Sequence, residues 1–301
     1  MQQSDRAGLL FTLAGFATLS IGDAIIKGMA EMWPPTAMAT TRYALAAIGL
    51  SAMLVARHGW RALFHMPRAG LQWLRGLSVA VATVAMFTAV WLMPLAEATT
   101  ITFTQPMITA LLASVFLGER LRPAAVVATL VAFGGVIIVL RPNFVEIGAA
   151  AMLPLLVALS MAVLMIANRA AAGAAGPWAM QAYVSLTASV FLIAATAVGH
   201  WSGVPRFVMH WPEWHVFARC AFIAFSATIA HIMIYMGTVK AGAATVAPMT
   251  YGQLLAAVLL GWIFFGEAPD PVALLGAAII VGAGLYLWSL GKARAPEEAA
   301  P

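Results

Sequence analysis

Ten runs of about 20 mostly apolar residues fill nearly all of the 301-residue chain. A helix needs about 20 apolar residues to cross the hydrocarbon core of a bilayer, whereas membrane β-barrels show alternating segments of about 10 residues. Charged residues make up only 9% of the chain, against about 25% in soluble domains. We therefore predict an all-α integral membrane protein with ten transmembrane helices and no separate soluble domain. The expected spans are 8–28, 36–56, 71–93, 98–117, 124–140, 148–169, 178–199, 215–237, 243–265 and 271–290.

The basic residues predict how the chain is oriented in the membrane. If the N-terminus is cytoplasmic, 11 of the 16 Lys and Arg residues fall on the cytoplasmic side, as the positive-inside rule requires. We expect both termini on that side of a bacterial inner (plasma) membrane. A net charge of +5 is too small to indicate a nucleic-acid partner, and the single Cys220 excludes an intrachain disulfide. We expect neither a metal nor a cofactor.

An internal repeat relates the two halves of the chain at a shift of 148 residues. Gln105 aligns with Gln253, and the segment 118–123 aligns with 266–271. Each half holds five expected helices, an odd number, so the halves would lie in the membrane with opposite orientations. The aligned loops agree, because 118–123 contains two Arg residues and 266–271 contains none.

The expected domains follow from this repeat. Residues 1–142 form the first five-helix half, 143–290 form the second, inverted half, and 291–301 form a cytoplasmic tail. Inverted repeats around a binding site near the bilayer midplane are typical of secondary transporters. The sequence therefore predicts two inverted five-helix repeats around a central cavity.

The repeated blocks resemble the ten-helix EamA-type permeases of the drug/metabolite transporter superfamily. In the first half the resemblance lies in Ala96-Glu97-Ala98 through Gln105-Pro106, in Leu117-Gly118-Glu119 and in Gly134-Gly135-Val136. In the second half it lies in 241–243, Gln253, 265–267 and 282–284, where Leu254 replaces the counterpart of Pro106. The resemblance implies a transporter, and the pattern is most similar to the bacterial exporters of aromatic and neutral amino acids.

Polar and aromatic residues inside the spans indicate where a substrate would bind. Polar side chains in spans usually face the interior of the helix bundle. The 148-residue shift also relates Thr83 and Phe87 to His231 and Tyr235, while a proline such as Pro106 frees backbone carbonyls for a ligand. Hydrogen bonding between helices is the alternative role for these side chains. The expected substrate-binding residues are Thr83, Phe87, Trp91, Thr102, Gln105, His231, Tyr235, Thr250, Tyr251 and Gln253.

Charged residues near the span ends suggest a gate or an ion pair. Asp23 and Lys27 are four residues apart, and together with Arg42 they can neutralise one another. They could form a gate that senses a zwitterion, or a structural ion pair. Glu119 and Glu267 end corresponding spans, where each could cap the following helix or take part in gating.

The most consistent function is that of a secondary transporter, not an enzyme. It would move neutral or aromatic amino acids, or similar small metabolites, by alternating access, and the resemblance favours export. Another hydrophobic or cationic metabolite or drug is an alternative substrate, and a membrane-embedded enzyme or a channel is an alternative class. The chain lacks the Walker A, Gly-x-Ser-x-Gly and His-Glu-x-x-His motifs. Cations are few and lie near span ends, which argues against a strongly anionic substrate. The expected partners are the substrate and the lipid bilayer, and a monomer is compatible with the sequence.

Overall fold

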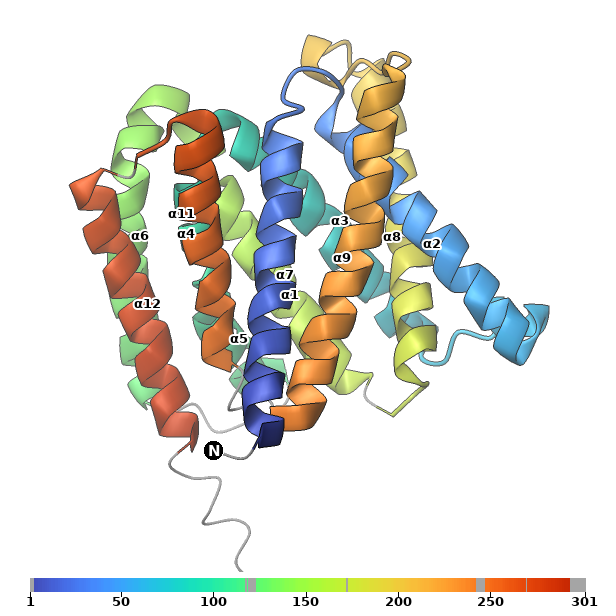
Figure 1. Cartoon of the computed structure of the whole chain (residues 1–301), viewed down its shortest axis with the longest axis horizontal. Helices are drawn as coiled ribbons and strands as arrows, with labels where there is room; N and C mark the ends of the chain where they lie inside the picture. The colour runs from blue at the N-terminus through green and yellow to red at the C-terminus, as the bar shows by residue number, and fades with distance from the viewer. Residues whose placement is uncertain are drawn as a thin grey trace, which may run out of the picture.

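The protein is all-helical in the computed structural model, which describes residues 3–116, 118, 123–171, 173–241, 247–268 and 270–292 (Figure 1). No strand occurs among these residues. The helices are α1 (Gln3–Lys27), α2 (Pro35–His58), η1 (Trp60–Leu63), α3 (Ala69–Leu92), α4 (Leu95–Thr102), α5 (Gln105–Phe116), α6 (Pro123–Ile147), η2 (Gly148–Met152), α7 (Leu153–Ala170), α8 (Pro177–Trp201), η3 (Pro205–Phe207), α9 (Trp214–Ala241), η4 (Ala247–Thr250), α11 (Tyr251–Phe265) and α12 (Pro271–Lys292).

Seven helical segments in the described part of the chain are long and apolar enough to cross a membrane. They are Arg6–Lys27, Pro35–His58, Ala69–Leu92, Leu95–Phe116, Val145–Ala170, Trp178–Trp201 and Trp214–Ile234. Three shorter apolar helices accompany them, namely Val126–Leu140, Tyr251–Phe265 and Pro271–Tyr286. The prediction of an all-α membrane protein is confirmed, whereas the count of ten spans stays a prediction.

Proline residues set the starts of four long helices. Helices α2, α6, α8 and α12 begin at Pro35, Pro123, Pro177 and Pro271. Proline fits the first helical turn because the missing N–H has no intrahelical acceptor there and the ring already fixes a helical φ. These prolines were visible in the sequence as breaks between apolar runs, so the helix boundaries follow from local chemistry.

The expected span 98–117 is two helices and not one. Helix α4 ends at Thr102, and α5 begins at Gln105, after a two-residue turn. Pro106 causes this break, because it has no N–H to donate to the carbonyl of Thr102 and its ring clashes there. The turn is closed instead by a tighter bond from the Thr104 amide to the carbonyl of Ile101, at 3.1 Å. Thr102 and Gln105 therefore lie on two separate helices.

Glycines allow α6 and α12 to approach each other closely. A Cβ on Gly135 would lie 2.8 Å from the carbonyl oxygen of Gly276, and a Cβ on Gly276 would lie 2.8 Å from that of Gly135. Lipid tails are as apolar as the side chains, so helix association in a membrane depends on such close packing. The crossing binds α6 and α12 into one pair, at the left of Figure 1.

The packing of the helices is symmetric under exchange of the two halves of the chain. Helix α1 packs on α9 as α7 packs on α3, and α1 packs on α11 as α7 packs on α5. The pairs α2–α8 and α6–α12 each join helices that would exchange with one another. The neighbouring positions of α1 and α9 and of α6 and α12 are visible in Figure 1.

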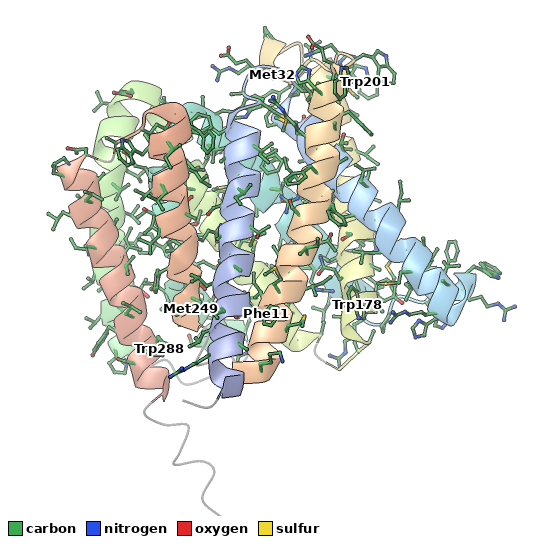
Figure 2. The ribbon with its side chains drawn as sticks, viewed as in Figure 1. Phe11, Met32, Trp178, Trp201, Met249 and Trp288 are labelled. Atoms are coloured by element: carbon green, nitrogen blue, oxygen red, sulfur yellow. The ribbon has the colours of Figure 1, made fainter. Side chains whose placement is uncertain are left out.

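The two ends of the helix bundle differ in what they carry. Figure 1 shows the N-terminus and the C-terminal end of α12 at the same end, which we call the terminal end. Met32 and Trp201 lie at the opposite end, whereas Trp178 and Trp288 lie nearer the terminal end (Figure 2). Tryptophans at both ends of a bundle are typical of the aromatic belts at the two membrane interfaces.

Candidate functional site

A cavity of about 1010 Å³ lies between the helices. Its walls come from α1, α2, α3, α4, α5, α7, α8, α9, η4 and α11, and no described residue of α6 or α12 lines it. The lining begins at Asp23 and Phe87, about one turn from the ends of α1 and α3 at the opposite end of the bundle. At the terminal end it runs to Asn168 and Trp178 in the outermost turns of α7 and α8, and to Arg75 in the second turn of α3. The α6–α12 pair is thus a scaffold beside the cavity.

Seven of the ten predicted substrate-binding residues line this cavity. They are Thr83, Phe87, Thr102, Gln105, His231, Thr250 and Gln253. The Thr83 hydroxyl lies 3.4 Å from the hydroxyl of Tyr43, which sequence reasoning missed. His231 Nδ1 lies 2.6 Å from the carbonyl oxygen of Ala227, so this nitrogen carries a proton.

Two of the predicted residues do not line the cavity. The Trp91 indole N–H donates to the carbonyl oxygen of Ile26 at 3.2 Å, which ties the end of α3 to α1. The Tyr251 ring packs on Phe103 with the ring centroids 5.3 Å apart. Its hydroxyl is directed at Gly284 of α12, behind the cavity wall. The prediction that these two aromatic rings line the cavity is therefore wrong, and the side chain of Tyr235 lies outside the described part.

Asp23 and Arg42 face the upper part of the cavity, toward the opposite end of the bundle. The Gln253 side chain and Arg42 both lie near enough to the Asp23 carboxyl group to stabilise its charge. The Arg42 guanidinium carbon lies 5.2 Å from the Tyr43 ring centroid and 5.8 Å from that of Phe87. Both charges are therefore within reach of a bound molecule.

Arg75 forms a polar cluster at the terminal end that sequence reasoning also missed. Its Nε donates to Asn168 Oδ1 at 2.5 Å, and its Nη1 donates to the carbonyl of Met180 at 3.1 Å and to Gln72 Oε1. Arg75 is buried, and the cluster joins α3, α7 and α8. Polar residues inside apolar spans were the available signal, since such residues rarely face lipid.

Lys27 and Glu267 form an ion pair at the opposite end of the bundle, which we call the latch. Lys27 Nζ lies 2.6 Å from Glu267 Oε1, and it also donates to the carbonyls of Val90 and Met93 at 2.9 and 2.8 Å. Glu267 Oε2 accepts from the Leu95 amide at 3.0 Å. The pair therefore joins the end of α1 to the end of α3, the start of α4 and the segment after α11.

Local backbone chemistry places Glu267 in this latch. Gly266 follows α11 with φ +66, a left-handed conformation that favours glycine, and its amide donates to the carbonyl of Trp262 at 3.2 Å. The Glu267 amide then donates to the carbonyl of Gly261 at 3.0 Å, which turns the chain back over the helix end. The Leu95 amide, at the first position of α4, has no intrahelical acceptor and bonds to the carboxylate.

The latch corrects two expectations about the charged residues. Lys27 pairs with Glu267 and not with Asp23 or Arg42, so the predicted mutual neutralisation of those three is wrong. Glu267 caps the amide at the start of α4 instead of the helix that follows it. Glu119 lies outside the described residues.

Comparison with known proteins identifies the fold and the family. The sequence profile described as the EamA-like transporter family matches residues 6–141 and again residues 148–289. The chain belongs to the EamA-like transporter family. A solved crystal structure has the same fold, with a TM-score of 0.63, 20% identity, and coverage of 95% of this chain and 98% of the other. The predicted resemblance to the drug/metabolite transporter superfamily is confirmed.

Three curated bacterial relatives carry transporter names. The riboflavin transporter of Rhizobium johnstonii is 29% identical over 93% of this chain and 88% of its own length. The S-adenosylmethionine uptake transporter of Rickettsia bellii is 27% identical over 71% of this chain and 66% of its own length. The pseudopaline exporter of Pseudomonas aeruginosa is 27% identical over 94% and 96%. The chain is therefore a multi-pass membrane protein of a bacterial transporter family.

Proposed function

We propose that this protein is a secondary transporter that moves a small metabolite across a bacterial inner membrane by alternating access. The main observation in support is one large cavity whose walls come from both stretches that match the family profile. A cavity at such an interface can open to either side when the two halves change their relative packing. The Lys27–Glu267 latch closes one end, and the lining reaches the outermost turns at the other.

We propose that the two matched stretches are inverted repeats of five spans each. The symmetric packing of the helices and the double match to one family profile support this arrangement. Helices α4 and α5 together, and η4 with α11, would each form one broken span. Half-helices of this kind expose backbone groups to a bound substrate. With α6 and α12 as one span each, the total would be ten membrane spans.

We propose that the terminal end faces the cytoplasm. The excess of Lys and Arg in the segments at that end supports this orientation under the positive-inside rule. The cavity would then face the cytoplasm in the present state, ready to receive a cytoplasmic substrate. Export stays the proposed direction from the resemblance, and relatives named for uptake and for export both match the chain.

The size and lining of the cavity support a metabolite larger than a single amino acid. Ligand pockets for drug-sized molecules measure about 300–1,000 Å³, and this cavity reaches the upper end of that range. Met86, Phe87 and Met161 offer apolar surface, while Gln105 and Gln253 offer hydrogen bonds. Neutral and aromatic amino acids stay among the candidate substrates, beside larger compounds with an aromatic or heterocyclic body.

Reconstitution in liposomes tests this proposal. The wild-type protein should accumulate at least one of riboflavin, S-adenosylmethionine and tryptophan above the level of protein-free vesicles. The Gln105→Ala/Gln253→Ala double variant should transport more slowly because it loses two polar groups of the cavity. Ser289→Ala on α12 removes an exposed hydroxyl outside the cavity and is the matched control. Absence of transport for all three compounds by the wild type would contradict the proposal.

Thiol labelling tests the inverted arrangement separately. Single reporter cysteines are introduced as Arg120→Cys and Ala268→Cys in a Cys220→Ala background. A membrane-impermeant maleimide should label the two positions from opposite sides of the membrane. Labelling from the same side would refute the inverted repeats.

A further inference from the structure

Arg42 differs from the other two cations around the cavity in how its donors are used. Lys27 is held by Glu267 and two carbonyls, and Arg75 is held by three acceptors. Within the described residues, the Arg42 guanidinium donates no hydrogen bond and has no carboxylate oxygen within 4.0 Å. The guanidinium lies over the Tyr43 and Phe87 rings. Its five N–H groups are therefore available to a molecule in the cavity.

At the position of Arg42, an ionised side chain without a hydrogen-bond partner is energetically unfavourable. It lies seven residues from the start of α2, about 10 Å along the helix from Pro35. An ionised side chain at such depth in a membrane protein is expensive and usually marks a substrate or ion site. The two aromatic rings hold the planar guanidinium by cation–π attraction and leave its edge free. An edge presented in this way matches the two oxygens of a carboxylate.

Asp23 supplies the opposite charge on the facing helix. Its carboxylate lies near the Gln253 side chain, and the Gln253 backbone carbonyl accepts a hydrogen bond from Ser20 Oγ at 2.7 Å. Asp23 interacts electrostatically with Arg42, yet the two do not close into an ion pair within 4.0 Å. A group that carries both an ammonium and a carboxylate can complete the interaction between them.

We infer that Asp23 and Arg42 bind the aminocarboxylate head of a zwitterionic metabolite, its carboxylate on Arg42 and its ammonium on Asp23. The rest of the molecule would extend toward Arg75, which is twelve residues and about 18 Å along α3 from Phe87. The substrate class is therefore an amino acid with an extended body. This inference rests on the proposed transport function, and it agrees with the expectation that the substrate is not strongly anionic.

Equilibrium binding to the purified full chain in lipid nanodiscs tests the head-group site. The probes are two matched pairs that differ only by the carboxylate: S-adenosylmethionine with decarboxylated S-adenosylmethionine, and tryptophan with tryptamine. At least one carboxylated probe should bind about tenfold or more tightly than its partner, because hydrogen bonds to a charged group are the strong ones. Arg42→Gln should abolish this preference, and Arg42→Lys should keep part of it because it retains charge without the planar fork.

Matched variants separate a binding role from a structural one. Arg219→Gln removes an exposed arginine outside the cavity and should leave the preference unchanged. Asp23→Asn should weaken both members of a pair, since each keeps its ammonium. Equal binding of both members of both pairs by the wild type, or an unchanged preference in Arg42→Gln, overturns the inference. Liposome uptake of at least one of riboflavin, S-adenosylmethionine and tryptophan by the wild type shows independently whether the transport function stands.

Discussion

Neutralising Glu267 should open the latch without removing the side chain. Glu267→Gln keeps an amide oxygen that can accept from the Leu95 amide, but it loses the charge that faces Lys27 at 2.6 Å. Lys27 keeps its bonds to the carbonyls of Val90 and Met93. The substitution therefore isolates the ion pair from the other contacts of the latch.

The expected size of the effect follows from the geometry of the pair. At 2.6 Å and an effective dielectric constant of about 20, the direct attraction is about 6 kcal/mol. The cost of removing both ions from water offsets most of it, and loss of one partner from a fully buried pair costs about 3–5 kcal/mol. The side chains of Lys27 and Glu267 are 11% and 21% exposed, so we expect about 2 kcal/mol. That corresponds to about a thirtyfold shift toward the open latch.

Thiol labelling measures the opening of the latch directly. Cys220 is buried and is the only cysteine in the sequence, so Cys220→Ala provides a cysteine-free background. Met93→Cys is the reporter, because residue 93 is 3% exposed and its carbonyl is bound by Lys27. A membrane-impermeant maleimide is added on the side of the membrane where the latch lies. It should label the reporter about thirtyfold faster in Glu267→Gln than in the wild type, provided that opening of the latch is fast relative to labelling.

A control and a double variant determine whether the ion pair is the cause. Glu213→Gln removes a carboxylate that lies 3.2 Å from His215 and is 80% exposed, so it should change labelling less than about twofold. Lys27→Met and Glu267→Gln should be non-additive when combined, since each removes the same interaction. Labelling of Glu267→Gln at the wild-type rate, or additive effects in the double variant, would refute the latch.

Three further substitutions test the packing, the buried arginine and the corrected tryptophan. Gly135→Ala should destabilise the fold by about 1–3 kcal/mol because its Cβ meets the backbone of Gly276, whereas Gly134→Ala, with nothing within 4 Å, should not; melting temperature in detergent compares the two. Arg75→Gln should lower the free energy of unfolding in denaturant by about 1.5–3 kcal/mol, because it breaks the hydrogen bonds from this buried cation to α7 and α8. An unchanged free energy of unfolding would contradict a stabilising role for the Arg75 cluster. Trp91→Phe should leave substrate affinity unchanged in a binding titration and lower the free energy of unfolding by about 0.5–1.5 kcal/mol, because the indole bonds to a carbonyl outside the cavity. A tenfold loss of substrate affinity would show that Trp91 belongs to the binding site.

Helix identity and most helix boundaries could be predicted because they depend on local chemistry. The bilayer sets the length of an apolar run, and prolines such as Pro35 and Pro271 begin helices wherever they occur. The break before Pro106 depends on the same chemistry, and the freed carbonyls were expected from the sequence, although the division of this span into α4 and α5 was not. The inverted topology was proposed from loop charges and stays a prediction.

The candidate site could be predicted only in part, because helical periodicity fixes angles along one helix and not the face that meets a neighbour. Gln105 and Gln253 were found as polar residues in apolar surroundings. Tyr251 was misplaced because its ring packs on Phe103 and its hydroxyl is directed at Gly284, contacts between distant segments that the sequence does not show. Trp91 lies at the end of α3, where it bonds to α1 instead of facing the cavity.

The sequence by itself determined that this chain is helical, lies in a membrane and belongs with transporters, because hydrophobic length, proline positions and repeated motifs are properties of the chain read in order. Only the tertiary structure decided which charges meet. Lys27 pairs with Glu267, 240 positions away, while Asp23 on the next turn faces Arg42 across the cavity. Electrostatic partners are set by distance in space, and helix packing controls that distance. Within the described residues, the same packing places Lys27 in the latch, Arg75 in the buried cluster and Arg42 beside the cavity with unused donors.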